Sequence, residues 1–282
     1  MAACDAARMK NVFQERILSG KNAYITGGTS GICLGIAELF AQQGARVAVQ
    51  GRNAEKVQAA VQVLSVHGGA LRGWAADVRD AAATGRGLQA AREEWGEIDI
   101  LICGAAGNFP ARASEISPNG FKAVVDIDLL GSFNTARMAW EHLRKPGASV
   151  IAISATHGAH PYGLQAHVCA AKAGVDMLCK VLALEWGPAG VRVNAIAPGP
   201  VDETEGMRRL APTADARAAV SAGVPLRRFA QIGEIAAAAL FLCCDAAAYI
   251  TGTVLNVDGG AALTGSRFIG EAPQARAGNR AT

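Results

Sequence analysis

The stretch from Tyr24 to Ala37 most constrains what this chain can fold into. An apolar run, Ala23 to Ile25, meets the glycine-rich segment Thr26 to Gly31, after which an apolar helical pattern begins. This order predicts a strand, a tight turn and a helix whose free N-terminal N–H groups favour a phosphate. Gly27 and Gly31 allow the backbone to turn sharply and to approach a ligand closely. By itself such a turn is weak evidence for a nucleotide site, because glycines punctuate many loops.

The end of the second predicted strand indicates which cofactor the chain binds. An apolar run, Arg46 to Gln50, is followed by Gly51 and Arg52. In a doubly wound fold a carboxylate here binds the 2′-hydroxyl of NAD, whereas an arginine can bind the 2′-phosphate of NADP. Because the position carries Arg52 and no acid, the sequence predicts NADP(H). The alternative is a solvated arginine at the start of a helix.

Strand-like and helix-like patterns alternate along the rest of the chain. Further strands are predicted for residues 71–75, 98–103, 149–154, 191–196 and 254–257, and helices for residues 55–66, 81–95, 119–143, 166–186 and 232–243. The strands are apolar without an inside-outside rhythm, which is typical of a parallel sheet covered on both faces. We therefore expect an α/β fold: a single-domain Rossmann fold whose doubly wound parallel sheet has about seven strands flanked by helices.

Length and composition favour one large domain and argue against several kinds of partner. The 282 residues suffice for a well-buried core, and 51% of them are hydrophobic. The net charge of +3 is too small, and the basic residues too scattered, to indicate nucleic acid. The seven cysteines form no CxxC pair, so we expect reduced thiols and no metal site.

The distribution of apolar residues along the chain bears on localisation and on domain boundaries. No run approaches the roughly 18 apolar residues of a membrane span, and the N-terminus lacks the hydrophobic core of a signal peptide. We expect a soluble, cytoplasmic protein with no membrane partner. The expected organisation is a leader over 1–19, a catalytic domain over 20–265 with a substrate-covering insertion over 202–223, and a flexible tail over 266–282.

The most distinctive loops all follow predicted strands. Ligands of doubly wound sheets bind beyond the carboxyl ends of the strands, where these loops meet. The ends in question carry the glycine-rich turn, Arg52, Asp77, residues 103–107, Ser154 and Pro198-Gly199.

Several short motifs in a fixed order carry a family resemblance. They are the turn at Gly27, Asp77-Val78, the alanine-rich turn ending at Gly107, Lys172, Arg192-Val193-Asn194 with Pro198-Gly199, and Asp258-Gly259-Gly260. Together they resemble the short-chain dehydrogenase/reductase family over residues 18–260. One departure is Cys33, which replaces the usual third glycine of the first turn. The resemblance implies cofactor contacts at Gly27, Thr29, Ser30, Gly31, Ile32, Arg52, Asp77, Val78, Ala105, Gly107, Lys172, Pro198, Gly199 and Val201.

The catalytic pattern departs from that family more seriously. The family combines a serine, a tyrosine four residues before a lysine, that lysine, and an asparagine on the preceding long helix. Lys172 is present, but the other three positions carry Ala155, Val168 and Asp128, with Ser154 next to the vacated serine position. The ordinary proton relay for ketones and alcohols therefore cannot operate in this chain.

One branch of the family resembles the chain in these departures too: the 2,4-dienoyl-CoA reductases, above all the peroxisomal type. The branch implies reduction of 2,4-dienoyl-CoA thioesters to 3-enoyl-CoA by NADPH, in the β-oxidation of unsaturated fatty acids. The motifs that carry the resemblance are residues 105–109 (AAGNF), 125–128 (VDID), 165–167 (QAH), 171–173 (AKA), 185–188 (EWGP), 197–200 (APGP) and 204–210 (TEGMRRL).

Reducing a conjugated thioester differs from reducing a ketone. Hydride adds to the δ carbon, negative charge spreads to the thioester oxygen as a dienolate, and a proton then adds to the α carbon. The site must therefore polarise the thioester oxygen and deliver a proton to carbon. We expect Lys172 to bind the nicotinamide ribose hydroxyls. Asp128 is expected to deliver the proton, directly or through a water that Lys172 positions; the alternative is a purely structural carboxylate.

Two further residues are candidates for a catalytic part. Ser154 ends a strand beside the expected nicotinamide position. The alternative is that its hydroxyl is only hydrogen-bonded within the fold and has no part in catalysis. His167 stands next to the vacated tyrosine position and could reach the thioester, although packing explains it equally well. Tyr162 lies six residues from that position, and the tyrosine's role is not assigned to it.

Four residues are expected to bind the acyl-CoA substrate. Asn108 and Phe109 lie in the AAGNF motif, and Arg208 and Arg209 lie in the insertion. A guanidinium fork matches the phosphates of coenzyme A. The alternative for the two arginines is an exposed basic helix end.

Two other functions stay open from the sequence. A reductase of the same fold could act on a ketone, a quinone or an enoyl thioester through Asp128, His157 or His167. A non-catalytic nucleotide-binding protein would also explain the missing tyrosine, although the retained Lys172 argues against it. The family's pairing of two long helices, here 119–143 and 166–186, implies a homotetramer.

Overall fold

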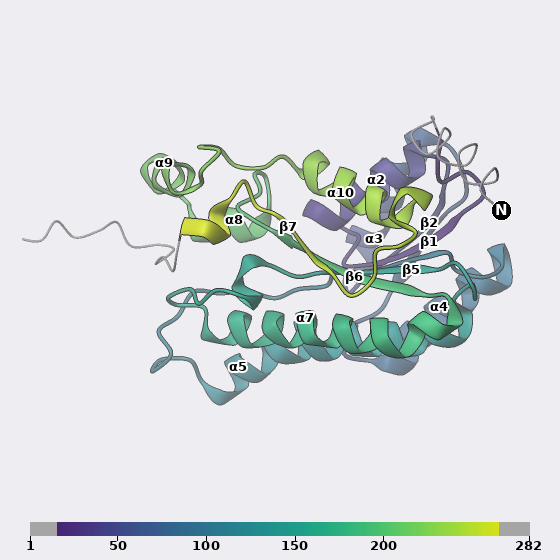
Figure 1. Ribbon diagram of the computed structural model, residues 1–282, viewed down its shortest axis with the longest axis horizontal. Coiled ribbons are helices and arrows are strands. Elements are labelled where there is room, and N and C mark those ends of the chain that lie inside the picture. The colour runs from purple at the N-terminus through teal and green to yellow at the C-terminus, as the bar shows by residue number, and fades with distance from the viewer. Residues whose placement is uncertain (1–15, 265–282) are drawn as a thin grey trace, which may run out of the picture.

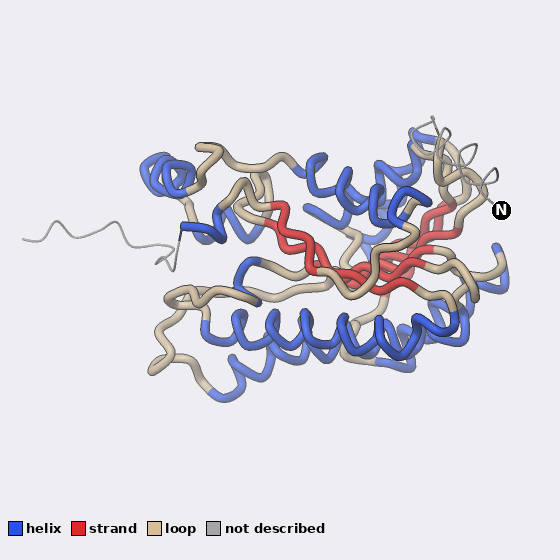
Figure 2. Tube along the Cα trace, viewed as in Figure 1, coloured by secondary structure: helices blue, strands red, loops and turns tan. Residues whose placement is uncertain are grey.

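The computed structural model describes residues 16–264 and confirms the predicted α/β architecture. Seven parallel strands lie in the order β3-β2-β1-β4-β5-β6-β7 (Figure 1, Figure 2). The strands are β1 (Asn22–Thr26), β2 (Arg46–Gly51), β3 (Leu71–Ala75), β4 (Ile100–Cys103), β5 (Ser149–Ile153), β6 (Arg192–Pro198) and β7 (Val254–Val257).

Helices cover both faces of the sheet, as Figure 1 shows. One apolar core lies between the sheet and α2 (Gly31–Gln42), α3 (Ala54–Leu64) and α10 (Ile232–Cys243). The other core lies between the sheet and three helices on the opposite face, α4 (Ala81–Trp95), α6 (Gly131–Ala139) and α7 (Ala166–Trp186). Side chains of one strand alternate between the two cores, which explains why the strands are apolar at consecutive positions.

The order of the strands reverses beside β1. This strand pairs with β2 on one side and with β4 on the other, and Thr26 lies opposite Cys103. The turn after β1 and the turn after β4 therefore leave the sheet side by side. A crevice outside the strands at such a switch point is where doubly wound folds bind ligands.

The predicted helix over 119–143 is interrupted. The structure has α5 (Pro118–Val125), a π-helical turn η2 (Asp126–Leu130), then α6 and a short 3₁₀ turn η3 (Trp140–His142). Ser117 caps α5, because its side chain accepts a hydrogen bond from the Gly120 N–H at 3.0 Å. π-turns inside helices recur at functional sites, and this one carries Asp128.

The insertion over 202–223 contains two helices, α8 (Glu205–Leu210) and α9 (Ala214–Gly223). Near the N-terminal end of the described residues, Leu18 is buried in the same apolar core as residues of α2. Most of the expected leader, residues 1–15, and the expected tail, residues 266–282, lie outside the described residues. Those two expectations remain predictions.

Gly27 illustrates why the first turn requires glycine. Its φ is +72°, and a Cβ added there would lie 2.6 Å from the Gly104 carbonyl oxygen and 2.7 Å from the Ala105 nitrogen. Both neighbours are backbone atoms, so neither can move aside without displacing the turn after β4. The close approach of the two turns thus depends on the missing side chain.

Replacing Gly27 with alanine is expected to lower the free energy of unfolding by about 1–3 kcal/mol, because the new Cβ is strained at positive φ and meets backbone. Urea denaturation of the purified protein measures this change. The matched control is Gly233→Ala on α10, where an added Cβ meets nothing within 4 Å. That control should leave stability unchanged or raise it slightly; equal stability of the two variants would contradict the analysis.

Candidate active site

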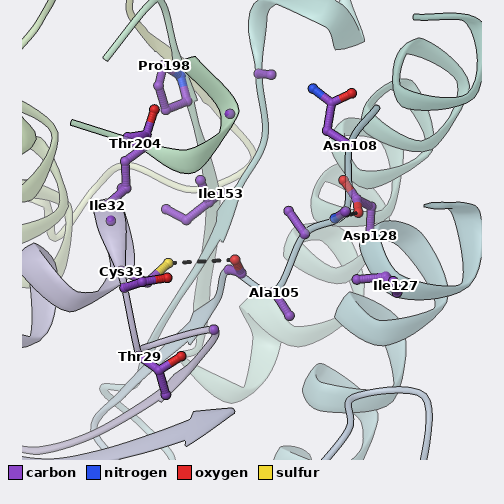
Figure 3. A pocket seen from close by; sticks show the side chains of 18 of the residues that line it. Thr29, Ile32, Cys33, Ala105, Asn108, Ile127, Asp128, Ile153, Pro198 and Thr204 are labelled. Carbon is purple, nitrogen blue, oxygen red and sulfur yellow. Dashed lines mark hydrogen bonds between the residues drawn. The ribbon is translucent and has the colours of Figure 1, made fainter. Parts of the chain in front are cut away.

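A cavity of about 490 Å³ opens at the carboxyl ends of the strands. Figure 3 shows Ile32 and Cys33 on one side of it and Asn108 and Asp128 on the other, with Ala105 between them. Most of the predicted site residues line this cavity: Gly27, Thr29, Ser30, Gly31, Ile32, Arg52, Val78, Ala105, Gly107, Asn108, Asp128, Ser154, Lys172, Pro198, Gly199 and Val201.

The turn after β1 can hold an anionic group. Ser30 is the extended N-cap of α2, and within the described residues its side chain makes no capping hydrogen bond. The first N–H groups of α2 are therefore free to bind a phosphate, and no acidic residue lies in its first turn. Together with the close approach of Gly27, these donors fit the pyrophosphate of a dinucleotide.

Cys33 takes the place of the third glycine without blocking the turn. Its sulfur lies 3.7 Å from the Gly104 carbonyl oxygen, and a Cβ added to Gly104 would lie only 2.1 Å from that sulfur. The glycine at 104 thus makes room for the cysteine at 33. Burial raises the pKa of the Cys33 thiol to about 12, so the group is neutral beside the turn.

The far end of the cavity is basic. Arg52, Asn53 and Lys56 line it, and the Asn53 side chain caps α3 by accepting a hydrogen bond from the Lys56 N–H at 2.9 Å. Asp77, a predicted cofactor contact, is not on the described cavity wall. Its carboxylate binds Arg79 through both oxygens, at 3.0 and 2.7 Å, and this pairing holds its pKa below the usual range.

Asp128 and Lys172 form a buried pair at the inner end of the cavity. The carboxylate is 1% exposed and Lys172 is 6% exposed. One Asp128 oxygen lies 3.1 Å from Lys172 Nζ, and the other accepts a hydrogen bond from the Gly107 N–H at 2.7 Å. Lys172 Nζ also donates to the Ile153 carbonyl at 2.9 Å. Both charges are therefore compensated at fixed positions, which a buried ion pair requires.

The cavity wall is apolar at the two positions where the family that the sequence resembles has its serine and its tyrosine. Ala155 and Val168 both line the cavity. Val168 is 4% exposed and packs in a small cluster with Val124 and Ala171. A hydroxyl relay is absent from this part of the described wall.

Ser154 lies between the cavity and a second buried carboxylate. It is 3% exposed and lines the cavity, with Asp176 of α7 behind it. Burial raises the pKa of Asp176, while the Ser154 hydroxyl, Lys180 and Lys172 act in the opposite direction. Sequence reasoning did not single out Asp176; its spacing of four residues from Lys172, which places both on one face of α7, was the available signal.

Two histidines of the β5–α7 region lie in different environments. His157 lines the cavity, and its ring stacks on Tyr162 with centroids 4.1 Å apart. Burial, aided by the Lys172 charge, lowers the pKa of His157 to about 4. His167 is fully buried beside Phe109, with ring centroids 4.3 Å apart, and is not on the described cavity wall.

Of the four predicted substrate residues, one lines the cavity and three lie outside its described wall. Asn108 lines the cavity, whereas Phe109 packs behind it against His167. Arg208 and Arg209 are exposed on α8, where both pair with Glu205, at 3.1 and 2.9 Å. Arg209 also donates to the Asn108 carbonyl at 3.4 Å. Arg209 therefore lies next to the cavity-lining Asn108, and both guanidinium groups are outside the described cavity wall.

Two kinds of feature are absent from the described residues. No cluster of three His, Cys, Asp or Glu side chains suitable for a metal occurs within residues 16–264. In the same part of the chain, no helix is long and apolar enough to span a membrane.

The chain is similar to known proteins over most of its length. A family model described as Enoyl-(Acyl carrier protein) reductase matches residues 27–262. A peroxisomal 2,4-dienoyl-CoA reductase, (3E)-enoyl-CoA-producing, of Saccharomyces cerevisiae is 42% identical over 258 residues, covering 89% of this chain and 87% of the relative. These similarities confirm the resemblance that the motifs carried.

Relatives with other names are nearly as similar. A D-threitol dehydrogenase of Mycolicibacterium smegmatis is 41% identical over 246 residues, covering 86% of this chain and 93% of that protein. Among solved structures, a citronellol catabolism dehydrogenase of Pseudomonas aeruginosa superposes with a TM-score of 0.77 at 32% identity, covering 89% of this chain and 98% of that one.

Acid is expected to destabilise the protein partly through His157. Its folded-state pKa of about 4 lies below the unfolded value of 6.5, so the unfolded state binds more protons between these pH values. The stabilising contribution is complete above pH 6.5 and is lost as the pH falls towards 4. Denaturation of wild type and His157→Phe at several pH values in this range measures the free energy of unfolding. This free energy should fall less steeply with decreasing pH in the variant. Parallel pH dependences would contradict the assignment.

Proposed function

This chain belongs to the short-chain dehydrogenase/reductase family, and on that premise we propose that it is an NADPH-dependent reductase of 2,4-dienoyl-CoA thioesters that yields 3-enoyl-CoA. The buried pair of Asp128 and Lys172 on the cavity wall carries the proposal, since Val168 there offers no phenol. The Saccharomyces cerevisiae relative, named for this reaction and its (3E)-enoyl product, supports it.

The reaction requires charge stabilisation and one proton. When bound, NADPH supplies the hydride that adds to the δ carbon of the dienoyl group. The resulting dienolate carries negative charge on the thioester oxygen and takes up a proton at the α carbon. No proton has to stay on the oxygen, so a site without a phenol suffices for this chemistry.

Asp128 and Lys172 are suited to handle that proton. The Gly107 N–H and the Lys172 ammonium hold the carboxylate on opposite oxygens, so it has one fixed orientation. We assign to the pair the positioning of a water that protonates the α carbon; the hydroxide left behind takes a proton from the Lys172 ammonium, which regains one from solvent. Lys172, anchored on the Ile153 carbonyl, also provides positive charge near the dienolate and donors for the ribose hydroxyls.

The family implies NAD(P)(H), and the basic end of the cavity favours NADP(H). Arg52 and Lys56 line that end, and Asp128 at the other end provides the single carboxylate on the described wall. Both cations can pair with a 2′-phosphate, and a nearby acid that would select NAD is absent from this wall. The coenzyme A phosphates are assigned to Arg208 and Arg209.

A second candidate function rests on the D-threitol dehydrogenase, which is 41% identical. A dehydrogenase of this kind would need another proton acceptor in place of the tyrosine, for which Asp128 is the candidate. Comparing oxidation of NADPH by a dienoyl-CoA with oxidation by ketones and reduction of NADP⁺ by polyols separates the two functions.

We also propose a homotetramer. Six large apolar side chains are exposed on the helices that precede and follow β5, which suits burial against another copy of the chain. They are Phe121, Leu130, Phe133, Met177, Val181 and Leu184. The cytoplasmic localisation remains a prediction, and relatives named as peroxisomal proteins offer the alternative.

Asp128→Asn is expected to lower kcat for 2,4-hexadienoyl-CoA at least about 10²-fold, because the carboxylate that positions the proton-donating water with Lys172 is lost. The decrease in NADPH absorbance at saturating substrate measures kcat, and product analysis should identify the 3-enoyl thioester. The control is Asp126→Asn in the same π-turn, where the carboxylate pairs with Lys122 near the surface. Full activity of Asp128→Asn would refute the role, and wild-type protein inactive with dienoyl thioesters would refute the function.

Arg209→Ala is expected to raise KM for 2,4-hexadienoyl-CoA while leaving KM for the pantetheine thioester unchanged, because only the former carries nucleotide phosphates. Steady-state kinetics with both substrates measure the contrast, which should reach several-fold, as for other charged contacts at an exposed site. Arg72→Ala is the control, since Arg72 of β3 is also an exposed arginine paired with a glutamate, Glu94 of α4, and is not on the described cavity wall. An equal change for both substrates would exclude a phosphate contact.

A further inference from the structure

The proposed reaction leaves one group unassigned, the donor to the thioester oxygen. On the β5–α7 side of the cavity, Ala155 and Val168 offer no donor. Lys172 is engaged by Asp128 and by the Ile153 carbonyl. The Ser154 hydroxyl also lacks a hydrogen-bond partner among the described residues, but the Asp176 carboxyl lies beside it and offers an acceptor. His157 is the remaining polar side chain of the described wall on this side.

His157 is held in place by its neighbours. It lies in the short 3₁₀ turn η4 (Thr156–Gly158), directly after Ala155 and Thr156. Its ring stacks on Tyr162 with an interplanar angle of 19°, and the Tyr162 hydroxyl hydrogen-bonds to Thr156 Oγ1 at 2.9 Å. Tyr162 is thus engaged in supporting the histidine ring.

The turn carrying His157 also packs tightly on α7. A Cβ added to Gly158 would lie 2.2 Å from an Asp176 carboxylate oxygen and 3.1 Å from the Lys172 carbonyl oxygen. The absence of a side chain at Gly158 permits this approach without displacing Asp176, and the Lys172 charge acts on the imidazole. The ring therefore has a fixed position at the catalytic end of the cavity.

The hydrogen-bonding capacity of this ring is unused. Both ring nitrogens are buried, and neither has a hydrogen-bond partner among the described residues. Buried polar atoms without partners are rare in native proteins and each one calls for an explanation. His157 as a whole is only partly buried on the cavity wall, so turning the ring over about its Cβ–Cγ bond would present a nitrogen to a substrate oxygen, which would provide that partner.

On the basis of the function proposed above, we propose that His157 is a catalytic residue that donates a hydrogen bond from a ring N–H to the thioester oxygen. The bond strengthens as negative charge develops on that oxygen, so it stabilises the dienolate more than the substrate. No proton leaves the ring: the α carbon receives its proton from the water held by Asp128 and Lys172. A ring that stays neutral at pH 7 suits this role, because one nitrogen carries hydrogen without adding a second cation beside Lys172.

Three variants test the donor. His157→Phe keeps the stack on Tyr162 and removes both nitrogens, and it should lower kcat about 10²–10³-fold, the effect of losing one such donor. The NADPH dissociation constant should not change, because the donor meets only the acyl group. His157→Gln restores an N–H and should recover at least ten-fold in kcat over the phenylalanine variant. His160→Phe, three residues on and outside the described cavity wall, should behave as wild type.

A spectroscopic measurement separates the donor from a structural role. In the dead-end complex with NADP⁺, the carbonyl stretch of ¹³C=O-labelled hexadienoyl-CoA should shift to lower frequency in wild type and in His157→Gln. The shift should be reduced in His157→Phe. His157→Leu replaces the phenylalanine variant if thermal melting shows that the latter is unfolded.

The outcomes distinguish this inference from the function on which it rests. Wild-type kcat and an unchanged carbonyl frequency in His157→Phe would overturn the inference alone. Equal losses in the phenylalanine and glutamine variants would also overturn it, since ring shape would then matter and the N–H would not. A wild-type protein that fails to reduce any dienoyl-CoA would refute the function itself.

Discussion

The buried pair of Asp128 and Lys172 is the interaction on which the inner end of the cavity depends. Removing two charges from water is unfavourable unless each finds close partners. Here the partners come from four separate segments: the π-turn, the turn after β4 through Gly107, the end of β5 through Ile153, and α7. Satisfying the pair therefore fixes these segments relative to one another, and it places both charged groups at the switch point of the sheet.

The π-turn explains how a carboxylate reaches that position from a helix. An extra residue in one helical turn changes the direction of the side chains that follow it. Asp128 then faces inward, while Ser132 closes the widened turn by donating to the Asp128 carbonyl at 2.6 Å. Asp126, two residues earlier, pairs with Lys122 nearer the surface. Two similar acids of one short segment thus have different environments, and only one can act in the cavity.

Val168, at the position where the family has a tyrosine, belongs to an apolar part of the cavity wall. Val168 takes part in an apolar cluster with Val124 and Ala171, a surface that the acyl group would contact under the proposed function. The polar atoms gather instead on Asp128, Lys172 and the turn after β5. This separation of apolar wall and polar end is consistent with a long conjugated substrate that carries charge at its thioester.

The sequence determined the fold and the membership of most residues in the site. Alternating apolar strands and helices required a doubly wound parallel sheet, and the glycine-rich turn with its flanking motifs located the ligand crevice. These features are local or periodic, so they can be read from neighbours in the chain. Tertiary structure alone decided which polar side chains face the cavity. His157 and His167 are both polar residues of one region, yet packing against Tyr162 leaves the first on the cavity wall and packing against Phe109 turns the second away. Asp77 is bound by Arg79, and a π-turn interrupts what reads as one continuous helix. Such outcomes depend on contacts between segments far apart in sequence, which no periodicity within a segment encodes.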